Sequence, residues 1–251
     1  MPETITVPAS VELAVVERSG FVESRHAGSA IVLDAEGVPL LTLGDVETPI
    51  LPRSSLKPLQ ALGSLTAGAV LDGERLALAT ASHAGTDRHV AVVREMLTAG
   101  GLSESDLGCP AAWPSDTVTR DEMVRELGSP QRIRMNCSGK HSAMLATCVV
   151  NDWPLETYME PTHPLQLVIQ ETIFDLSGEE EQELGIDGCG LPIVPLSLTN
   201  LARAFGRLPS AEPDSPERAV ADAVRENPFL VSGTGSGLGD MGAMSEVKWG
   251  V

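Results

Sequence analysis

The order of apolar and polar residues predicts a β-hairpin near the start of the chain. Residues 29–33 and 38–43 are rich in Val, Ile and Leu, which is typical of strands. The intervening residues 34–37 end in Gly37, which can adopt the positive φ that a tight turn requires. We therefore expect the two segments to pair as antiparallel neighbours.

Beyond the hairpin, apolar residues recur at intervals of three and four, the spacing of helices that bury one face. A helix is expected to begin within residues 53–58, because Pro58 suits a first helical turn, where a missing N–H costs nothing. Thr86 is a good N-cap residue for a helix over residues 87–98. Further helices are expected over residues 75–80, 121–127, 140–149, 164–176, 198–205 and 217–226.

This order of elements, a hairpin followed mainly by helices, favours an α+β fold in which helices pack on an antiparallel sheet. The chain has 251 residues and shows no internal repeat, so we expect one domain over residues 1–251. Glycine-rich breaks between the elements are the places where loops could carry chemistry.

Composition narrows the class of protein. The formal net charge is -18, so the surface should repel nucleic acid and anionic membranes. No segment has the ~20 apolar residues of a membrane span, and residues 1–13 lack the basic start of a signal peptide. The cysteines are Cys109, Cys137, Cys148 and Cys189. They would stay reduced in the cytosol, and we expect a cytoplasmic protein.

The spacing of Ser54 and Lys57 is a first candidate for chemistry. Three residues apart on a helix, their side chains would share a face with Cβ atoms ~5–6 Å apart. A neutral lysine can take the hydroxyl proton and make the serine a nucleophile, as in the S-x-x-K motif of serine β-lactamases. The plainer interpretation is a capping serine beside a solvated lysine, and spacing alone leaves both open.

Two further regions contain candidate side chains. Ser82 and His83 stand in a break before the helix expected over residues 87–98. The serine could donate to a substrate or cap the helix, and the histidine could be a base or a structural residue. Cys137 and Cys189 lie in turns close to glycines, but without a C-x-x-C motif their spacing does not separate a metal site from two buried thiols.

Taken together, four blocks of the sequence resemble the signature blocks of the L-asparaginase II family, the rhizobial type. The blocks are residues 53–58 (RSSLKP), 81–85 (ASHAG), 136–141 (NCSGKH) and 187–192 (DGCGLP). Residues 22–26 match as well, and the resemblance continues to Gly235. Four blocks in the right order are far more specific than any one motif.

The resemblance implies a fold similar to serine β-lactamases and glutaminases, a homodimer, and hydrolysis of L-asparagine to L-aspartate and ammonia. It places Ser54 with Lys57 in one serine–lysine pair and Ser82 in a second. It also places Cys137, Lys140 and Cys189 on a zinc site beside the substrate, where the metal either anchors two loops or orients the substrate.

The same resemblance puts Arg53 and Asp187 in the substrate pocket, where we also expect His83. Arg53 is the best candidate to hold the α-carboxylate of asparagine, because a guanidinium binds a carboxylate in two places. In the expected reaction Ser54 attacks the side-chain amide and Lys57 takes its proton. Ser82 either relays that proton or is itself the nucleophile, and the sequence leaves this choice open.

The end of the chain departs from the family pattern. Beyond Gly235 we expect a lysine in a glycine-rich block and then further strands, but here Lys248 is followed closely by the last residue, Val251. We assign Lys248 to the second pair, and expect a chain that ends there to lack part of the sheet and to be poorly active. Alternative functions are a glutaminase, another serine–lysine amidase, or a non-catalytic relative that only binds a ligand.

Overall fold

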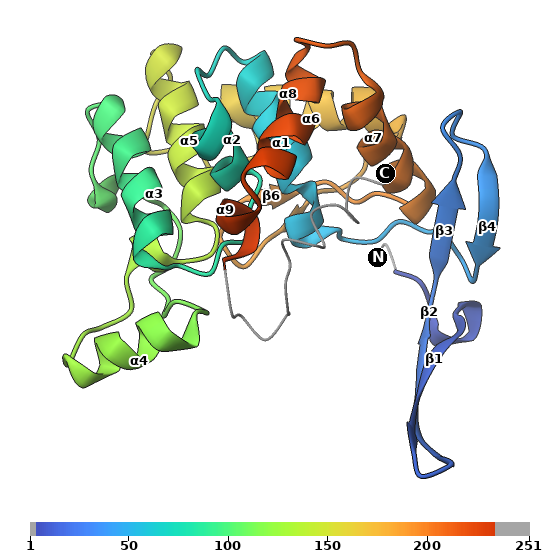
Figure 1. Ribbon diagram of the computed structural model, residues 1–251. Coiled ribbons are helices and arrows are strands. Elements are labelled where there is room, and N and C mark those ends of the chain that lie inside the picture. Colours follow the sequence, from blue (N-terminus) through green and yellow to red (C-terminus); the bar gives the residue numbers. More distant parts are fainter. Residues whose placement is uncertain (1–3, 234–251) are drawn as a thin grey trace.

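The described strands form antiparallel pairs, and those of β1 to β4 lie at the margin of a helical body (Figure 1). The computed structural model describes residues 4–233. Within that range β1 (Val11–Arg18) pairs with β2 (Phe21–Gly28), β3 (Ala30–Leu33) with β4 (Pro39–Leu43), and β5 (Gly185–Ile186) with β6 (Pro192–Ile193). The fold is α+β, as expected, although its sheets contain two strands each.

The hairpin expected from the sequence is confirmed as β3 and β4. The register pairs Ala30 with Leu43 and Val32 with Leu41. The Asp34 carboxylate accepts hydrogen bonds from two backbone N–H groups of the turn, and Gly37 has the positive φ of 79° that the turn requires. The hairpin lies against α7 (Leu198–Ser210), which gives β3 a partly buried face.

The ribbon of β1 and β2 was not expected from the sequence. It extends away from the helical body, and nearly all of its residues are exposed (Figure 1). The two strands are joined by Ser19 and Gly20, which both have positive φ, the conformation of a two-residue hairpin turn. That serine–glycine pair was the available signal. The strands themselves were missed because neither shows a clean alternation of apolar and polar residues.

The remaining described elements are helices, and the expected ones are confirmed. They are α1 (Lys57–Thr66), α2 (Gly73–Ala79), α3 (Asp87–Ala99), α4 (Thr117–Arg125), α5 (Ser138–Val150), α6 (Pro164–Ser177), α7, α8 (Pro216–Glu226) and α9 (Pro228–Ser232), with short 3₁₀ turns at Val7–Ala9, Arg53–Leu56, Glu104–Asp106 and Arg132–Arg134. Helix α4 begins earlier than expected because the Asp116 carboxylate caps it by accepting the Thr119 N–H. Among residues 4–233, no helix is both long and apolar enough to cross a membrane.

Helix α5 runs through the middle of the core, and most of its residues are buried. It packs against α1, α2 and α3, while α1 also packs against α6 and α8. Burial of its polar first turn has to be offset by specific partners, since an unpaired buried polar group is costly. The start of α5 is therefore the place in the core where polar side chains gather.

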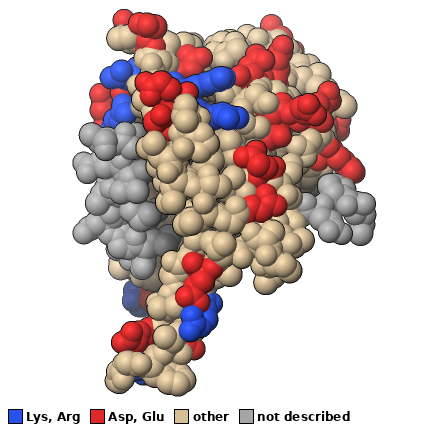
Figure 2. Space-filling view, turned by 90° about the vertical axis from the view of Figure 1, so that its right-hand side faces the viewer, with Lys and Arg blue, Asp and Glu red and all other residues tan. Residues whose placement is uncertain are grey.

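Acidic side chains dominate the surface. The chain has 35 Asp and Glu against 17 Lys and Arg, and Figure 2 shows acidic groups spread across the face that carries the hairpin and the ribbon. The only lysines in the sequence are Lys57, Lys140 and Lys248, so the other basic side chains are all arginines. Within residues 4–233 both lysines are buried, so their positions need a chemical explanation.

Candidate active site

The 3₁₀ turn before α1 positions the first candidates. Arg53 has a φ of 54°, a left-handed conformation that is uncommon for a residue with a side chain and often marks a functional site. Ser54 follows and is half-buried, while Lys57 opens α1 and is fully buried. Pro58 occupies the second position of that helix, as the sequence predicted. The turn therefore places the Arg53 guanidinium at the surface and the Lys57 amine in the interior.

The structure pairs Lys57 with Ser82. The lysine Nζ lies 2.9 Å from Ser82 Oγ, and it donates to the carbonyls of Ala81 at 2.6 Å and Asn136 at 3.1 Å. The Cys137 thiol is a further neighbour of this amine. The spacing argument had set Lys57 against Ser54, which shares its helical start, but the described contacts of the amine come from residues far along the chain. Ser82 itself is exposed, so a substrate can reach it.

Burial lowers the pKa of Lys57 from 10.5 to about 8, with Cys137 acting in the opposite direction and Lys140 in the same one. The two carbonyls each take one N–H of the amine. As an ammonium, Lys57 also donates to Ser82 Oγ. A neutral amine has two N–H groups and one lone pair, and in that form the lone pair can accept the Ser82 hydroxyl proton. The site can therefore hold a lysine as a proton acceptor for a serine.

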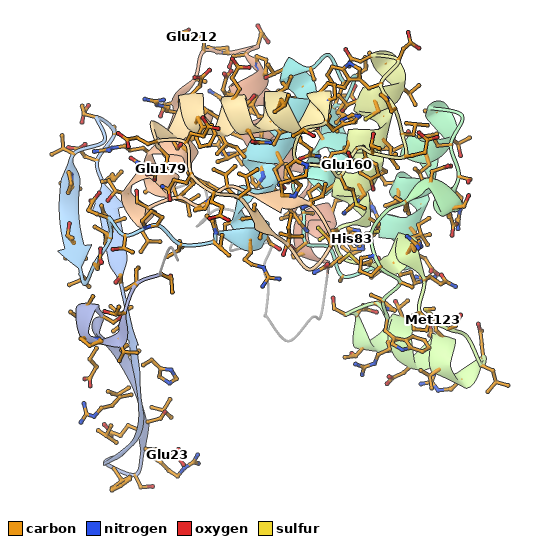
Figure 3. The ribbon with its side chains drawn as sticks, turned by 180° about the vertical axis from the view of Figure 1, so that it is seen from behind. Glu23, His83, Met123, Glu160, Glu179 and Glu212 are labelled. Carbon is orange, nitrogen blue, oxygen red and sulfur yellow. The ribbon has the colours of Figure 1, made fainter. Side chains whose placement is uncertain are left out.

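His83 is placed differently from a substrate-binding residue. Its ring is fully buried inside the helical body (Figure 3), and its nitrogens contact Ser138 Oγ at 2.9 Å and the Gly85 N–H at 3.2 Å. The His83 backbone N–H also donates to Asn136 O. Both nitrogens are occupied within the protein, so the residue fixes the Ser82 loop to the start of α5.

The start of α5 collects three reactive side chains on one face. Cys137 is the N-cap residue, and Lys140 and His141 follow three and four positions later, which places them on the same side of a helix. All three are buried. Gly139 makes this possible, because a Cβ there would lie 2.6 Å from the Leu78 carbonyl at the end of α2.

Cys189 joins this face from the distant glycine-rich turn. The Cys137 thiol donates to Asn136 Oδ1 at 3.3 Å and the Cys189 thiol to Asp187 Oδ2 at 3.7 Å. The interaction with Cys189, opposed by burial and supported by Lys57 and Lys140, lowers the pKa of Cys137 to about 6. The same interaction and burial raise the pKa of Cys189 to about 11, so Cys137 is the more readily deprotonated of the two thiols. The predicted metal ligands Cys137, Lys140 and Cys189 do come together.

Asp187 links the same turn to Arg53. The Arg53 Nε donates to Asp187 Oδ1 at 2.8 Å, although the arginine side chain is 63% exposed and that of the aspartate only 7%. Burial acts to raise the pKa of Asp187, but the Gly188 N–H, Lys140 and Arg53 outweigh it and the pKa is lowered. The terminal nitrogens of Arg53 have no polar partner among residues 4–233 and face outward. They are available to an anionic ligand.

The donor set suits a zinc ion. Within residues 4–233, no group of three His, Cys, Asp or Glu has the geometry of a metal site, but that ligand set leaves out lysine. Two neighbouring thiols, one with a lowered pKa, and a buried amine are sulfur and nitrogen donors of the kind that zinc prefers. The Nε2 of buried His141 also lacks a well-formed hydrogen bond and adds a polar atom to the same cluster.

Three groups at this site were not assigned roles from the sequence. The carbonyls of Ala81 and Asn136 could not be foreseen, since a backbone oxygen leaves no trace in the residue type. His141 could have been, because its spacing from Cys137 puts both on one helical face. Lys248, predicted to serve a second serine–lysine pair, lies outside the described residues.

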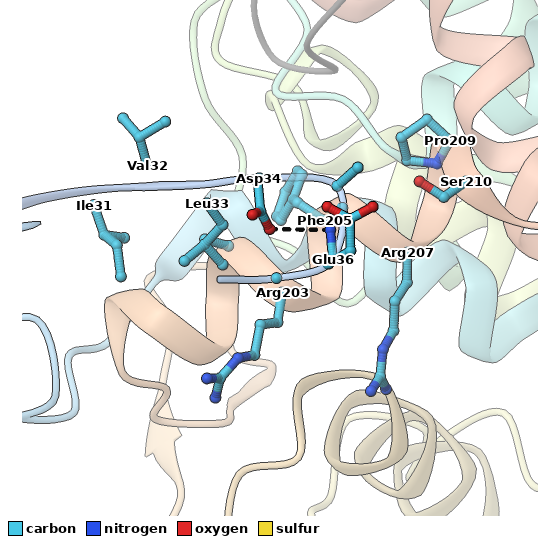
Figure 4. Close-up of a pocket in the computed structure, with 14 residues that line it drawn as sticks. Ile31, Val32, Leu33, Asp34, Glu36, Arg203, Phe205, Arg207, Pro209 and Ser210 are labelled. Carbon is cyan, nitrogen blue, oxygen red and sulfur yellow. Dashed lines mark hydrogen bonds between the residues drawn. The ribbon is translucent and has the colours of Figure 1, made fainter. Parts of the chain in front are cut away.

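A large groove of the described structure lies elsewhere. It encloses about 780 Å³ between the β3–β4 hairpin and α7, and Figure 4 shows Asp34 and Glu36 on one side of it with Arg203 and Arg207 on the other. None of the candidate site residues line this groove. The candidate site is therefore assigned on its chemistry rather than on the size of a cavity.

Comparisons with known proteins identify the family of the chain. No curated protein matches the chain. The family model of L-asparaginase II matches residues 14–248, which include each predicted site residue. Because that match spans most of its 251 residues, the chain belongs to the L-asparaginase II family and is an amidohydrolase.

Proposed function

We propose that this protein hydrolyses the side-chain amide of L-asparagine, giving L-aspartate and ammonia, through a serine activated by lysine. The observation that carries the proposal is the contact between the buried amine of Lys57 and the exposed hydroxyl of Ser82. Family membership supplies the substrate, and this contact supplies a base within reach of a nucleophile.

In the first step, Ser82 Oγ attacks the side-chain amide carbon while Lys57 accepts the hydroxyl proton. The protonated lysine then gives that proton to the amide nitrogen, and the C–N bond breaks to release ammonia. Water hydrolyses the resulting ester and restores the serine. With a pKa of about 8, about a tenth of the Lys57 side chains are neutral at pH 7, which is sufficient for a general base.

Arg53 binds the α-carboxylate of the substrate in this proposal. Its Nε is held by Asp187, which leaves the terminal nitrogens to form paired hydrogen bonds to a carboxylate. The left-handed backbone of Arg53 fixes this direction. Ser54 lies next to Arg53, half-buried, and we assign it to contacts with the bound substrate or its leaving group. The buried ring of His83 holds the Ser82 loop in position.

We further propose that Cys137, Lys140 and Cys189 hold one zinc ion. Bound there, zinc would keep Lys140 neutral and join the start of α5 to the distant Cys189 turn. The residues themselves support this role, because both thiols and the amine are buried and are close enough to shift the pKa of the thiols. Elemental analysis should find about one zinc per chain, and Cys189→Ala should remove it.

The β1–β2 ribbon supports the proposal of a homodimer. Two-stranded ribbons are marginally stable alone in water, yet this one exposes several large apolar side chains. They are Val11, Leu13, Val15, Val16, Phe21 and Val22. A second copy would cover them. The four cysteines are unpaired thiols, which supports a reducing, cytoplasmic location.

Ammonia release from L-asparagine and L-glutamine, measured side by side, tests the function. We expect faster release from asparagine. Ser82→Ala should reduce this rate by orders of magnitude, whereas the control variant Ser55→Ala should remain close to wild type. Even slow release supports the proposal if Ser82→Ala abolishes it. Equal or faster turnover of glutamine would refute the substrate while leaving the amidase chemistry intact.

A further inference from the structure

A buried tyrosine and histidine lie behind the thiol pair. His141 and Tyr158 are both buried, and their rings meet edge to face at 5.7 Å. The Tyr158 hydroxyl lies 2.5 Å from His141 Nδ1, and it also accepts the Gly108 N–H at 2.9 Å. The proposed reaction does not use either side chain. Neither reaches the surface, so their role has to be exerted through a neighbour.

The contacts of the hydroxyl fix where its proton lies. A phenol has one O–H to donate, and the Gly108 N–H can act only as a donor toward it. Burial raises the pKa of Tyr158 well above its usual value, so the phenol keeps its proton. That proton therefore points to His141 Nδ1, which must be an unprotonated acceptor. In a neutral imidazole the remaining proton is then on Nε2.

The fit around the hydroxyl is tight. A Cβ on Gly108 would lie 2.7 Å from Tyr158 Oη and 2.7 Å from Met159 Sδ, so only glycine lets the phenol reach this backbone N–H. His141 is held equally firmly, because its own N–H donates to Cys137 O in the first turn of α5. The pair is therefore a rigid support and not a mobile one.

The Nε2 of His141 is the free end of this support. It is buried and has no well-formed hydrogen-bond partner among the described residues. The Cys189 thiol interacts with this imidazole: burial lowers the pKa of His141, and Cys189 acts in the opposite direction. The order of groups is Gly108 N–H, Tyr158 O–H, His141, Cys189 and Cys137.

We propose that Tyr158 and His141 are positioning residues that lock the Nε2–H tautomer of His141 and aim that N–H at the Cys189 sulfur. The donated hydrogen bond orients Cys189 toward Cys137 and favours its thiolate when a metal binds. Outer partners of this kind commonly change metal affinity about 10–100-fold. This inference deepens the proposed zinc site, but its first test needs neither zinc nor substrate.

The tautomer can be read directly by NMR of metal-free protein labelled with ¹⁵N at its 5 histidines. We expect His141 to carry its proton on Nε2 in the wild type. Tyr158→Phe keeps the ring contact but removes the hydroxyl, and should release this preference. A proton on Nδ1 in the wild type, or an unchanged tautomer in Tyr158→Phe, would overturn the proposal whether or not the protein is an asparaginase.

Zinc competition with a chelator provides the second test. Tyr158→Phe should weaken zinc binding about tenfold or more, and His141→Phe further, while His141→Gln, whose amide can replace Nε2–H, should lose less. His163→Gln is the control, since that buried histidine contacts Pro154 and Leu165 away from the thiols. Unchanged affinity in Tyr158→Phe, or a zinc-bound Nε2 in the loaded protein, would contradict a positioning role. If neither the wild type nor any variant binds zinc, the proposal of a zinc site fails. The tautomer of His141 then still tests the positioning role of Tyr158.

Discussion

An arginine could not replace Lys57 as a general base, because a lysine ammonium can lose its proton near neutral pH and a guanidinium cannot. Burial lowers the pKa of Lys57 to about 8, and the carbonyls of Ala81 and Asn136 leave its third position to Ser82. The base is active when neutral, so activity should rise as pH increases toward 8 and level off above it. The pH profile of kcat/KM for asparagine measures this.

Lys57→Arg is the matched variant for that profile. It keeps a cation in the buried position but cannot act as a base, so we expect a loss of several orders of magnitude at every pH. With only three lysines in the chain, ¹⁵N-lysine NMR can follow Lys57 directly. A flat pH profile, or a Lys57 signal that titrates near 10.5, would rule out this residue as the base.

His89 gives a separate pH dependence, on stability. Its Nδ1 accepts the Thr86 N–H in a capping box at the start of α3, so Nε2–H donates to Phe229 O. Burial lowers the His89 pKa from 6.5 to about 4. Between these values the unfolded chain binds a proton that the folded one excludes, so stability must fall as pH decreases from 6.5 to 4.

The comparison with His89→Gln isolates this contribution from other groups that titrate in acid. Glutamine can fill the same place in a capping box but does not titrate. We expect the melting temperature of the wild type to fall more steeply between pH 6.5 and 4 than that of His89→Gln. Parallel slopes would show that His89 is protonated in the folded protein.

Which residues gather at the candidate site was predictable, but not how they pair. Four sequence blocks supplied Arg53, Lys57, Ser82 and Cys189 because catalytic side chains leave a trace in residue type. The partner of Lys57 was not predictable from its spacing to Ser54. That choice depends on a contact across 25 positions of the chain and on two carbonyls of other loops. The burial of His83 was not predictable either, because it also depends on contacts with distant parts of the chain.

At the scale of elements, the start of α5 depends on its close approach to α2. A Cβ at Gly139 would lie 2.6 Å from Leu78 O and 2.7 Å from Leu78 Cγ. Gly139→Ala should therefore destabilise the protein by about 1–3 kcal/mol and displace Cys137 and Lys140 from the site. Chemical denaturation and zinc content measure the two effects.

Gly206→Ala in α7 is the control, because a Cβ there meets no atom within 4 Å. In an open helical position this change should be neutral or stabilising by up to about 1 kcal/mol. Equal effects of the two substitutions would mean that helix propensity, and not the contact with α2, explains Gly139.

The helices and the β3–β4 hairpin were predictable because each buries one face, and burial leaves a periodic pattern. The β1–β2 ribbon was not, since exposure on both faces removes the pattern. Its turn, Ser19 and Gly20, was the remaining signal, and both residues have the positive φ of such turns. The early start of α4 depends on the cap at Asp116, which hydrophobic spacing does not register.

At the scale of the whole molecule, a net charge of -18 makes association of two copies costly unless apolar surface is covered. The exposed ribbon offers such surface, with Phe21 73% exposed beside the turn. We expect Phe21→Lys to shift a dimer toward monomer in sedimentation analysis. Val118→Lys, at a 64% exposed position on α4, should leave the dimer intact. Equal effects of both substitutions would exclude the ribbon as the interface.

The central claim is that Ser82, activated by Lys57, forms the bond to the substrate. A diazoketone analogue of asparagine places an electrophilic carbon beside the nucleophile, and peptide mapping by mass spectrometry identifies the labelled side chain. The account predicts a single label on Ser82 that L-asparagine protects against and that Lys57→Arg prevents. A label on Ser54, with Ser82 unmodified, would contradict it.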